Sequence, residues 1–200
     1  MRSNLKGFSI DGATLTDICF QRILLCDKLE HFGFHRAYNL NGKTFSIIWQ
    51  YLKNLRTLKL TFGNQVGNQD TYALFINGKK EMSFLEIIDF TGCWKMKNET
   101  IEAISDSCPN LKKLILKCCK NVTDIACLKK CENLEILNIA FCLRLSVNSW
   151  LPVQPSIQTI FIEQGKNLDA ILKDLKNEKK HVNIRICHSQ YTKSFEKYLV

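Results

Sequence analysis

The sequence predicts an α/β solenoid, in which a parallel sheet lines the concave side and helices cover the convex side. The first observation behind this prediction is a hydrophobic pattern whose successive copies begin 23 to 30 residues apart along the 200-residue chain. The second is that a segment with helical spacing follows several of these copies. A single strand and helix of about 25 residues cannot bury their apolar faces alone, so the copies must stack side by side.

The repeated pattern is clearest in the middle of the chain, where it has the form LxxLxLxxC. One copy runs from Leu111 to Cys119, the next from Leu134 to Cys142, and an earlier one from Leu85 to Cys93. Apolar residues at the fourth and sixth positions give the period of two that is typical of a strand with one buried face. Looser copies extend the pattern in both directions, so that we expect a solenoid over residues 1–190 with about eight strands, starting near residues 5, 29, 55, 85, 111, 134, 157 and 181.

Helical spacing fills several of the gaps between these strands. Many of these segments begin with Asn or Thr at the expected N-cap and carry an acidic residue in the first turn. The expected helices cover residues 14–25, 44–52, 98–104, 123–128 and 167–175.

The two ends of the predicted solenoid differ. Residues 191–200 have apolar side chains with helical spacing, so we expect this segment to cap the last strand. The few residues before Leu5 cannot cover exposed core in the same way. We therefore expect a finished C-terminal end and an incomplete N-terminal end.

The composition is that of a globular protein, with 46% hydrophobic and 24% charged residues and a net charge of +9. No apolar run approaches the roughly 18 residues that a membrane-spanning helix requires. The N-terminus also lacks the apolar segment of a secretory signal. We therefore expect a cytoplasmic or nuclear protein without a membrane association, whose ten cysteines are thiols.

A more specific pattern links the chain to a known family. The segment from Cys108 to Asp124 resembles a nearly complete cysteine-containing leucine-rich repeat, with the family pattern CxxLxxLxLxxCxxITD. Cys131 opens the following copy in the same way, and Cys26 opens an earlier one. The resemblance implies a leucine-rich-repeat horseshoe like those that hold substrates in SCF ubiquitin ligases containing F-box proteins.

The resemblance lacks one part of the family. The sequence leaves no room for an F-box, which would dock the ligase scaffold, before the first repeat at Leu5. We therefore expect either a fragment or short isoform of an F-box protein or a repeat-only relative. Repeat-only relatives also exist, among them small adaptor proteins and the mitochondrial ATP synthase coupling factor B. A role in protein degradation and a role as a scaffold or assembly factor therefore both remain open.

Catalytic and metal-binding patterns are not apparent. The repeat itself accounts for most cysteines, there is no CxxC pair, and the four histidines lie in no nucleophile motif. Cys118 and Cys187 differ from the others, because the register directs them toward the concave side as exposed thiols. We expect no enzyme activity, no cofactor and no metal.

The concave face is the predicted functional surface. The third, fifth and seventh residues of each copy point away from the core, and four of them form an apolar trail over adjacent strands. Charged residues, including Lys59, surround this trail, as in a protein-binding patch. The β-propensity of isoleucine is the alternative explanation. The candidate protein-binding residues are Ile87, Asp89, Lys113, Ile115, Lys117, Ile136, Asn138 and Phe161.

Two expectations follow from this assignment. If the trail is exposed, replacing Ile115 and Ile136 together with Asp should abolish partner capture and leave the thermal midpoint unchanged. A nucleic-acid surface is the third possibility, since the chain is basic, but the face offers only Phe161, Arg185 and the flanking Arg36 for stacking.

Overall fold

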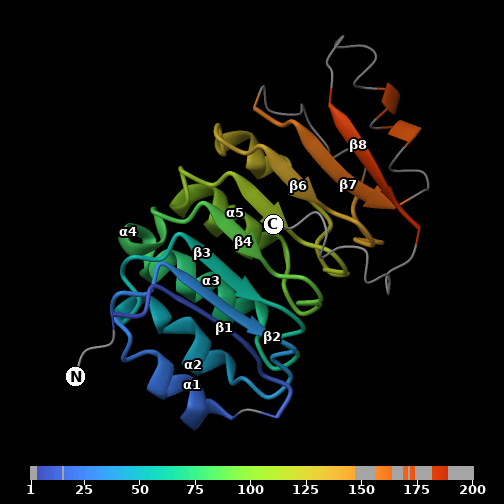
Figure 1. Ribbon diagram of the computed structural model, residues 1–200. Coiled ribbons are helices and arrows are strands. Elements are labelled where there is room, and N and C mark those ends of the chain that lie inside the picture. The colour runs from blue at the N-terminus through green and yellow to red at the C-terminus, as the bar shows by residue number, and fades with distance from the viewer. Residues whose placement is uncertain are drawn as a thin grey trace.

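The strands form one parallel sheet in sequence order, β1 to β8, as Figure 1 shows. The computed structural model describes residues 4–14, 16–146, 156–163, 169–170, 172–173 and 182–188. Each strand begins two residues after a predicted repeat start, which confirms the predicted sheet. The strands are β1 (Gly7–Asp11), β2 (His31–His35), β3 (Thr57–Leu60), β4 (Ile87–Asp89), β5 (Lys113–Ile115), β6 (Ile136–Asn138), β7 (Thr159–Glu163) and β8 (Asn183–Cys187).

The register between neighbouring strands follows the repeat. The third residue of each copy pairs with the third residue of the next, so that Ile87 pairs with Lys113 and Lys113 with Ile136. Because a slip of one residue would turn every buried leucine to the other face, the hydrophobic pattern itself fixes this register.

The described helices cover one face of the sheet, and none of them lies on the other face, which we call the helix-free face (Figure 1). Four of the predicted helical segments contain helix, and so do the described residues 169–170 and 172–173 of the fifth, but the two helices between β3 and β4 were not predicted. Predicted segment 167–175 lies largely, and capping segment 191–200 entirely, outside the described residues. The helices are α1 (Asp17–Ile23), α2 (Gly42–Ser46), α3 (Asn68–Asn77), α4 (Lys79–Met82) and α5 (Asn98–Ser107), with 3-10 turns η1 (Ile48–Gln50) and η2 (Ala126–Lys130).

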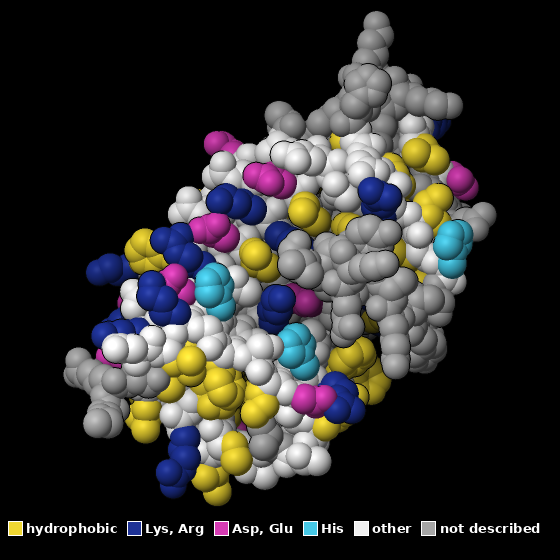
Figure 2. Space-filling view, in the orientation of Figure 1, with side chains coloured by type: hydrophobic (Ala, Val, Ile, Leu, Met, Phe, Trp, Pro, Cys, Tyr) yellow, Lys and Arg dark blue, Asp and Glu magenta, His cyan; other side chains and the backbone are white. Residues whose placement is uncertain are grey.

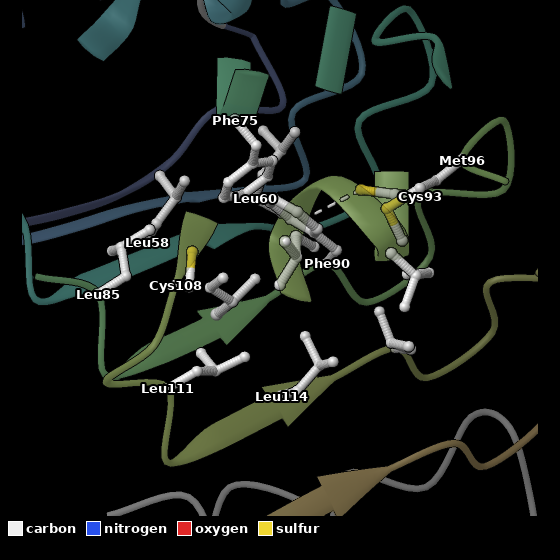
Figure 3. Close-up of a cluster of buried hydrophobic side chains, with 14 of the residues drawn as sticks. Leu58, Leu60, Phe75, Leu85, Phe90, Cys93, Met96, Cys108, Leu111 and Leu114 are labelled. Atoms are coloured by element: carbon white, nitrogen blue, oxygen red, sulfur yellow. Dashed lines mark hydrogen bonds between the residues drawn. The ribbon is translucent and has the colours of Figure 1, made fainter. Parts of the chain in front are cut away.

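The core lies between the sheet and the helices. Figure 3 shows leucines of successive repeats beneath one another, with Phe75 of α3 and Phe90 packed beside them. Leu58, Leu85 and Leu111 are all fully buried. In the inner repeats the first, fourth and sixth motif positions therefore supply the core, as the pattern predicts, whereas Leu5 of the first copy and Ile186 of the last are 39% and 45% exposed.

Each strand is followed by a sharp turn at the eighth motif position. In five consecutive repeats this residue has a positive φ, which reverses the chain toward the helices. Only one of the five is a glycine, and a Cβ at Gly92 would lie 2.5 Å from the Phe62 ring. The residues are Arg36, Phe62, Gly92, Cys118 and Phe141.

None of the helices in the described part of the chain combines the length and hydropathy needed to cross a bilayer.

Candidate functional site

The candidate site is the helix-free face of the sheet at strands β4 to β7. The register places the eight candidate residues together there. Ile87, Lys113 and Ile136 form one row across β4, β5 and β6. A second row crosses the same strands and continues to Phe161 in β7 through Asp89, Ile115 and Asn138. Lys117, two residues after β5, completes the set of eight candidate residues, which we call the central patch.

The exposure of the central patch differs from the expectation. Ile87, Lys113, Ile136 and Phe161 are partly exposed, but the other four are buried. Ile115 is 2% exposed and Asn138 is 1% exposed, while Asp89 and Lys117 reach only 5% and 7%. The prediction that all eight form an exposed surface is therefore wrong for these four residues.

Local hydrogen bonds explain two of the buried side chains. The Asp89 Oδ1 atom accepts from the Thr91 backbone N–H at 2.9 Å and from the Thr91 hydroxyl at 2.7 Å. Asn138 Oδ1 accepts from the Ala140 N–H at 3.1 Å. Side chains of this type end strands by offering the backbone a partner two residues on. Both residues are therefore turn formers at the ends of β4 and β6.

The neighbouring isoleucine, Ile115, is also buried. Ile115 lies between Asp89 and Asn138, at a strand spacing of about 4.8 Å on each side. Alternation sets the direction of its side chain but not its exposure. Ile115 is buried without belonging to the core cluster between sheet and helices, so the predicted double substitution with Asp is a poor probe at this position.

Burial shifts the protonation of the charged residues here. Desolvation raises the pKa of Asp89 above its ordinary value, although its hydrogen bonds to Thr91 and the charge of Lys59 oppose that shift. Desolvation also lowers the pKa values of Lys113 and Lys117. In each case burial disfavours the charged form. The patch thus holds charges that water solvates only in part.

The eighth-position turns supply residues that the sequence analysis missed. The Lys117 ammonium lies 5.9 Å from the centre of the Phe141 ring, within the range of a cation–π contact. The Phe141 backbone N–H donates to Glu163 Oε2 at 2.5 Å. The eighth motif position follows the strand at the same offset in each of these repeats. The place of Phe141 beside the patch could therefore have been predicted from the register.

The cysteines of the ninth motif position form a ladder behind the strand ends. The thiols of Cys93, Cys119 and Cys142 each donate to a backbone carbonyl of the preceding repeat, at 3.0 to 3.2 Å. Burial raises the pKa values of Cys93 and Cys142 to about 12. These thiols are therefore protonated donors at neutral pH rather than nucleophiles.

The two cysteines expected on the concave side behave differently from the prediction. Cys187 is buried, with 9% of its surface exposed, and Cys118 is only partly exposed. Desolvation raises the pKa of both thiols. Cys118 also occupies the left-handed turn position, where the chain leaves the sheet, so alternation along the strand does not place its side chain.

The described residues contain no group of three or more His, Cys, Asp or Glu side chains that could hold a metal ion. A polar cleft of about 390 Å³ lies among residues of the helix side, including Asp17 and Asp70. Both carboxylates are already occupied: Asp17 accepts from the Asn41 N–H and Asp70 from the Gly67 N–H, each at 2.8 Å. The two carboxylates that line the cleft therefore stabilise the neighbouring turns.

The sheet, its register and the helices on one face define an α/β solenoid of the leucine-rich-repeat type. No family model matches the chain, and no curated protein matches it. Among solved structures, 14 chains match. One belongs to the crystal structure of the Rad7 and Elc1 complex from yeast, with a TM-score of 0.63 and 19% sequence identity. The match covers 77% of this chain and only 40% of that chain. At this identity the likeness shows the fold.

Proposed function

We propose that this chain is a protein-binding module built from cysteine-containing leucine repeats, and that it selects substrates for an SCF-type ubiquitin ligase. The observation that carries the binding role is the central patch. Partly exposed apolar side chains of Ile87, Ile136 and Phe161 lie among lysines on adjacent strands of the helix-free face. Apolar anchors inside a charged surround are typical of protein-binding surfaces.

Two observations support the link to protein degradation. The first is the sequence pattern from Cys108 to Asp124, which resembles the repeats of F-box proteins. The second is the fold shared with a chain of the Rad7 and Elc1 complex. We propose no catalytic role and no cofactor for the chain.

A single substitution tests the binding role. Ile136 is partly exposed on the patch and lies outside the core cluster, and an aspartate there would lie in register beside Lys113. Ile136→Asp should therefore leave the thermal midpoint unchanged and remove the partners that the wild-type chain captures from cells. Ile76→Asp is the matched control, because Ile76 is an exposed isoleucine of α3, 43% exposed.

The captured proteins separate the candidate functions. Ligase scaffold subunits among them, identified by mass spectrometry, would support substrate recognition in an SCF complex. Partners that depend on Ile136 but come without any ligase subunit would favour the second candidate, a scaffold or assembly factor. Equal capture by the wild-type chain and Ile136→Asp would contradict binding through the central patch.

A further inference from the structure

Three lysines surround one carboxyl on the central patch. Lys59 lies in β3 and Lys113 in β5, while Asp89 lies on the strand between them. Lys117 follows β5 by two residues. The charges of all three act on Asp89 or are acted on by it. Figure 2 shows basic side chains beside acidic and hydrophobic ones on the face of the molecule in view.

Two of these lysines have no ion-pair partner within the described part of the chain. Neither Lys59 nor Lys113 is among the residues that form salt bridges there. The adjacent Lys112, by contrast, reaches Glu86 at 2.9 Å on the edge of the sheet. Lys113 is partly buried, and both desolvation and the nearby Lys59 disfavour its charged form. A partly desolvated ammonium group gains free energy when an anion replaces its lost water.

Asp89 is a weak counter-ion for Lys59 and Lys113. Both hydrogen bonds that Asp89 accepts from Thr91 go to the same oxygen, Oδ1, and burial disfavours its ionised form. Lys59 and Lys113, which form no salt bridge among the described residues, share this carboxyl. The cluster therefore keeps an excess of positive charge on the helix-free face.

Apolar side chains lie directly beside Lys113. Lys113 pairs in register with Ile87 on one side and Ile136 on the other, at a strand spacing of about 4.8 Å. Phe161 continues the apolar side of the patch in β7. A group bound at Lys113 would thus bring its neighbours within contact of Ile136.

We infer that the central patch, together with the adjacent Lys59 of β3, recognises a segment of another protein in which an acidic side chain lies next to an aliphatic or aromatic one. The acid is held by Lys59 and Lys113, and the apolar side chain contacts Ile136 and Phe161. This inference rests on the proposed protein-binding function and adds the chemistry of the partner.

The same features disfavour a nucleic acid as the occupant. A phosphate backbone would meet Asp89 in the middle of the lysines and isoleucines on either side of Lys113. Arginine, which binds phosphate with two parallel hydrogen bonds, is scarce on the patch. Arg36 at the edge of the sheet is already paired with Asp11.

The test measures binding of the wild-type chain to an array of 15-residue peptides. These peptides combine acidic, basic or neutral residues with apolar ones. Peptides that bind should be enriched in an acid next to an aliphatic or aromatic residue, and their affinity should fall as salt is added. The double variant Lys59→Gln/Lys113→Gln should bind them about tenfold or more weakly. Lys79→Gln/Lys80→Gln, two exposed lysines of α4, is the control with the same change in net charge.

The outcomes separate this inference from the proposed function. Peptides that bind through Ile136 but show no preference for acids would overturn the inference and leave the function standing. An equal loss of affinity in the control pair would also overturn it, because general charge would then explain the binding. If no peptide binds and a 20-base-pair DNA duplex binds instead, both the function and the inference fail.

Discussion

The N-terminal and middle repeats share one fold but hold their cores together in different ways. The N-terminal repeats stack phenylalanines: Phe20 lies edge-on to both Phe32 and Phe34, with ring centres 5.5 Å apart in each pair. Their ninth motif positions are Ala13, Ala37 and Gly63, which have no side-chain donor. The middle repeats place a cysteine there, whose thiol bonds back to the preceding repeat. The same repeat backbone therefore accommodates stacked phenylalanines in the N-terminal repeats and hydrogen-bonded cysteines in the middle repeats.

The strands differ in the same way. Strands β1 and β2 have five residues each, whereas β4, β5 and β6 have three. In β4 and β6 the shortening coincides with Asp89 and Asn138, whose side chains bond to the backbone two residues on. The central patch therefore lies where strands are short and polar side chains end them.

The largest expected effect is on the aromatic core. Phe34→Ala should destabilise the fold by about 3–5 kcal/mol, because it removes a fully buried ring and leaves a cavity. Leu116 occupies the same motif position in a middle repeat, so Leu116→Ala is the matched variant and should cost no more. Chemical denaturation of both variants measures the difference. A cost for Phe34→Ala well below that of Leu116→Ala would break the contrast between the two regions.

The thiol ladder should contribute less. Cys119→Ala should lower stability by about 1–2 kcal/mol, because it removes a buried hydrogen bond to the Phe90 carbonyl and a little volume. Cys19 is exposed, so Cys19→Ala should change nothing measurable. The same denaturation experiment applies, and equal stabilities for Cys119→Ala and the wild type would show that the ladder is not stabilising.

Replacing Asp89 should raise stability, unlike the two substitutions above. Because burial raises its pKa in the folded state, the ionised carboxyl disfavours folding, and stability is lost as the pH rises through that folded pKa. Asp89→Asn removes this loss while keeping the oxygen that Thr91 binds, as Asn138 does in β6. The variant should gain on the order of 1 kcal/mol at pH 7. The gain should vanish in acid, and a gain independent of pH would contradict burial as its cause.

The smallest effect on stability is expected from the ion pairs directly before strands β3, β4 and β5. The second motif positions of the first six repeats alternate in charge, and Glu86 pairs with Arg56 at 2.6 Å and with Lys112 at 2.9 Å. These pairs lower the pKa of Glu86, so their contribution is present above its ordinary pKa of 4.5 and is lost as the pH falls through the lowered value. Glu86→Gln should cost at most about 1 kcal/mol at low salt and less at high salt.

Much of this fold was predictable because its signal is periodic. Each leucine of the motif marks a position relative to the sheet, so the strands, their order and their register follow from the spacing alone. Helices α3 and α4 escaped prediction, because α3 opens with polar residues and buries Thr71 along with Leu74 and Phe75. Its apolar spacing is correspondingly weak.

The candidate site was predictable in position but not in exposure. The strand register places Ile115, Asp89 and Asn138 in one row, as the repeat predicts. Their burial, and the turn hydrogen bonds of Asp89 and Asn138, are not contained in a strand pattern. Likewise, the thiol of Cys93 finds its acceptor on Leu60, 33 residues away. Contacts of this kind follow only from the stacked structure.

The central claim is that partners bind the helix-free face at the central patch. It is tested most directly by measuring the affinity of one captured partner for the wild-type chain, Ile136→Asp and Ile76→Asp, with folding of all three checked by thermal denaturation. The account predicts that binding is lost in Ile136→Asp alone. Binding retained in Ile136→Asp, or lost in Ile76→Asp, would contradict it.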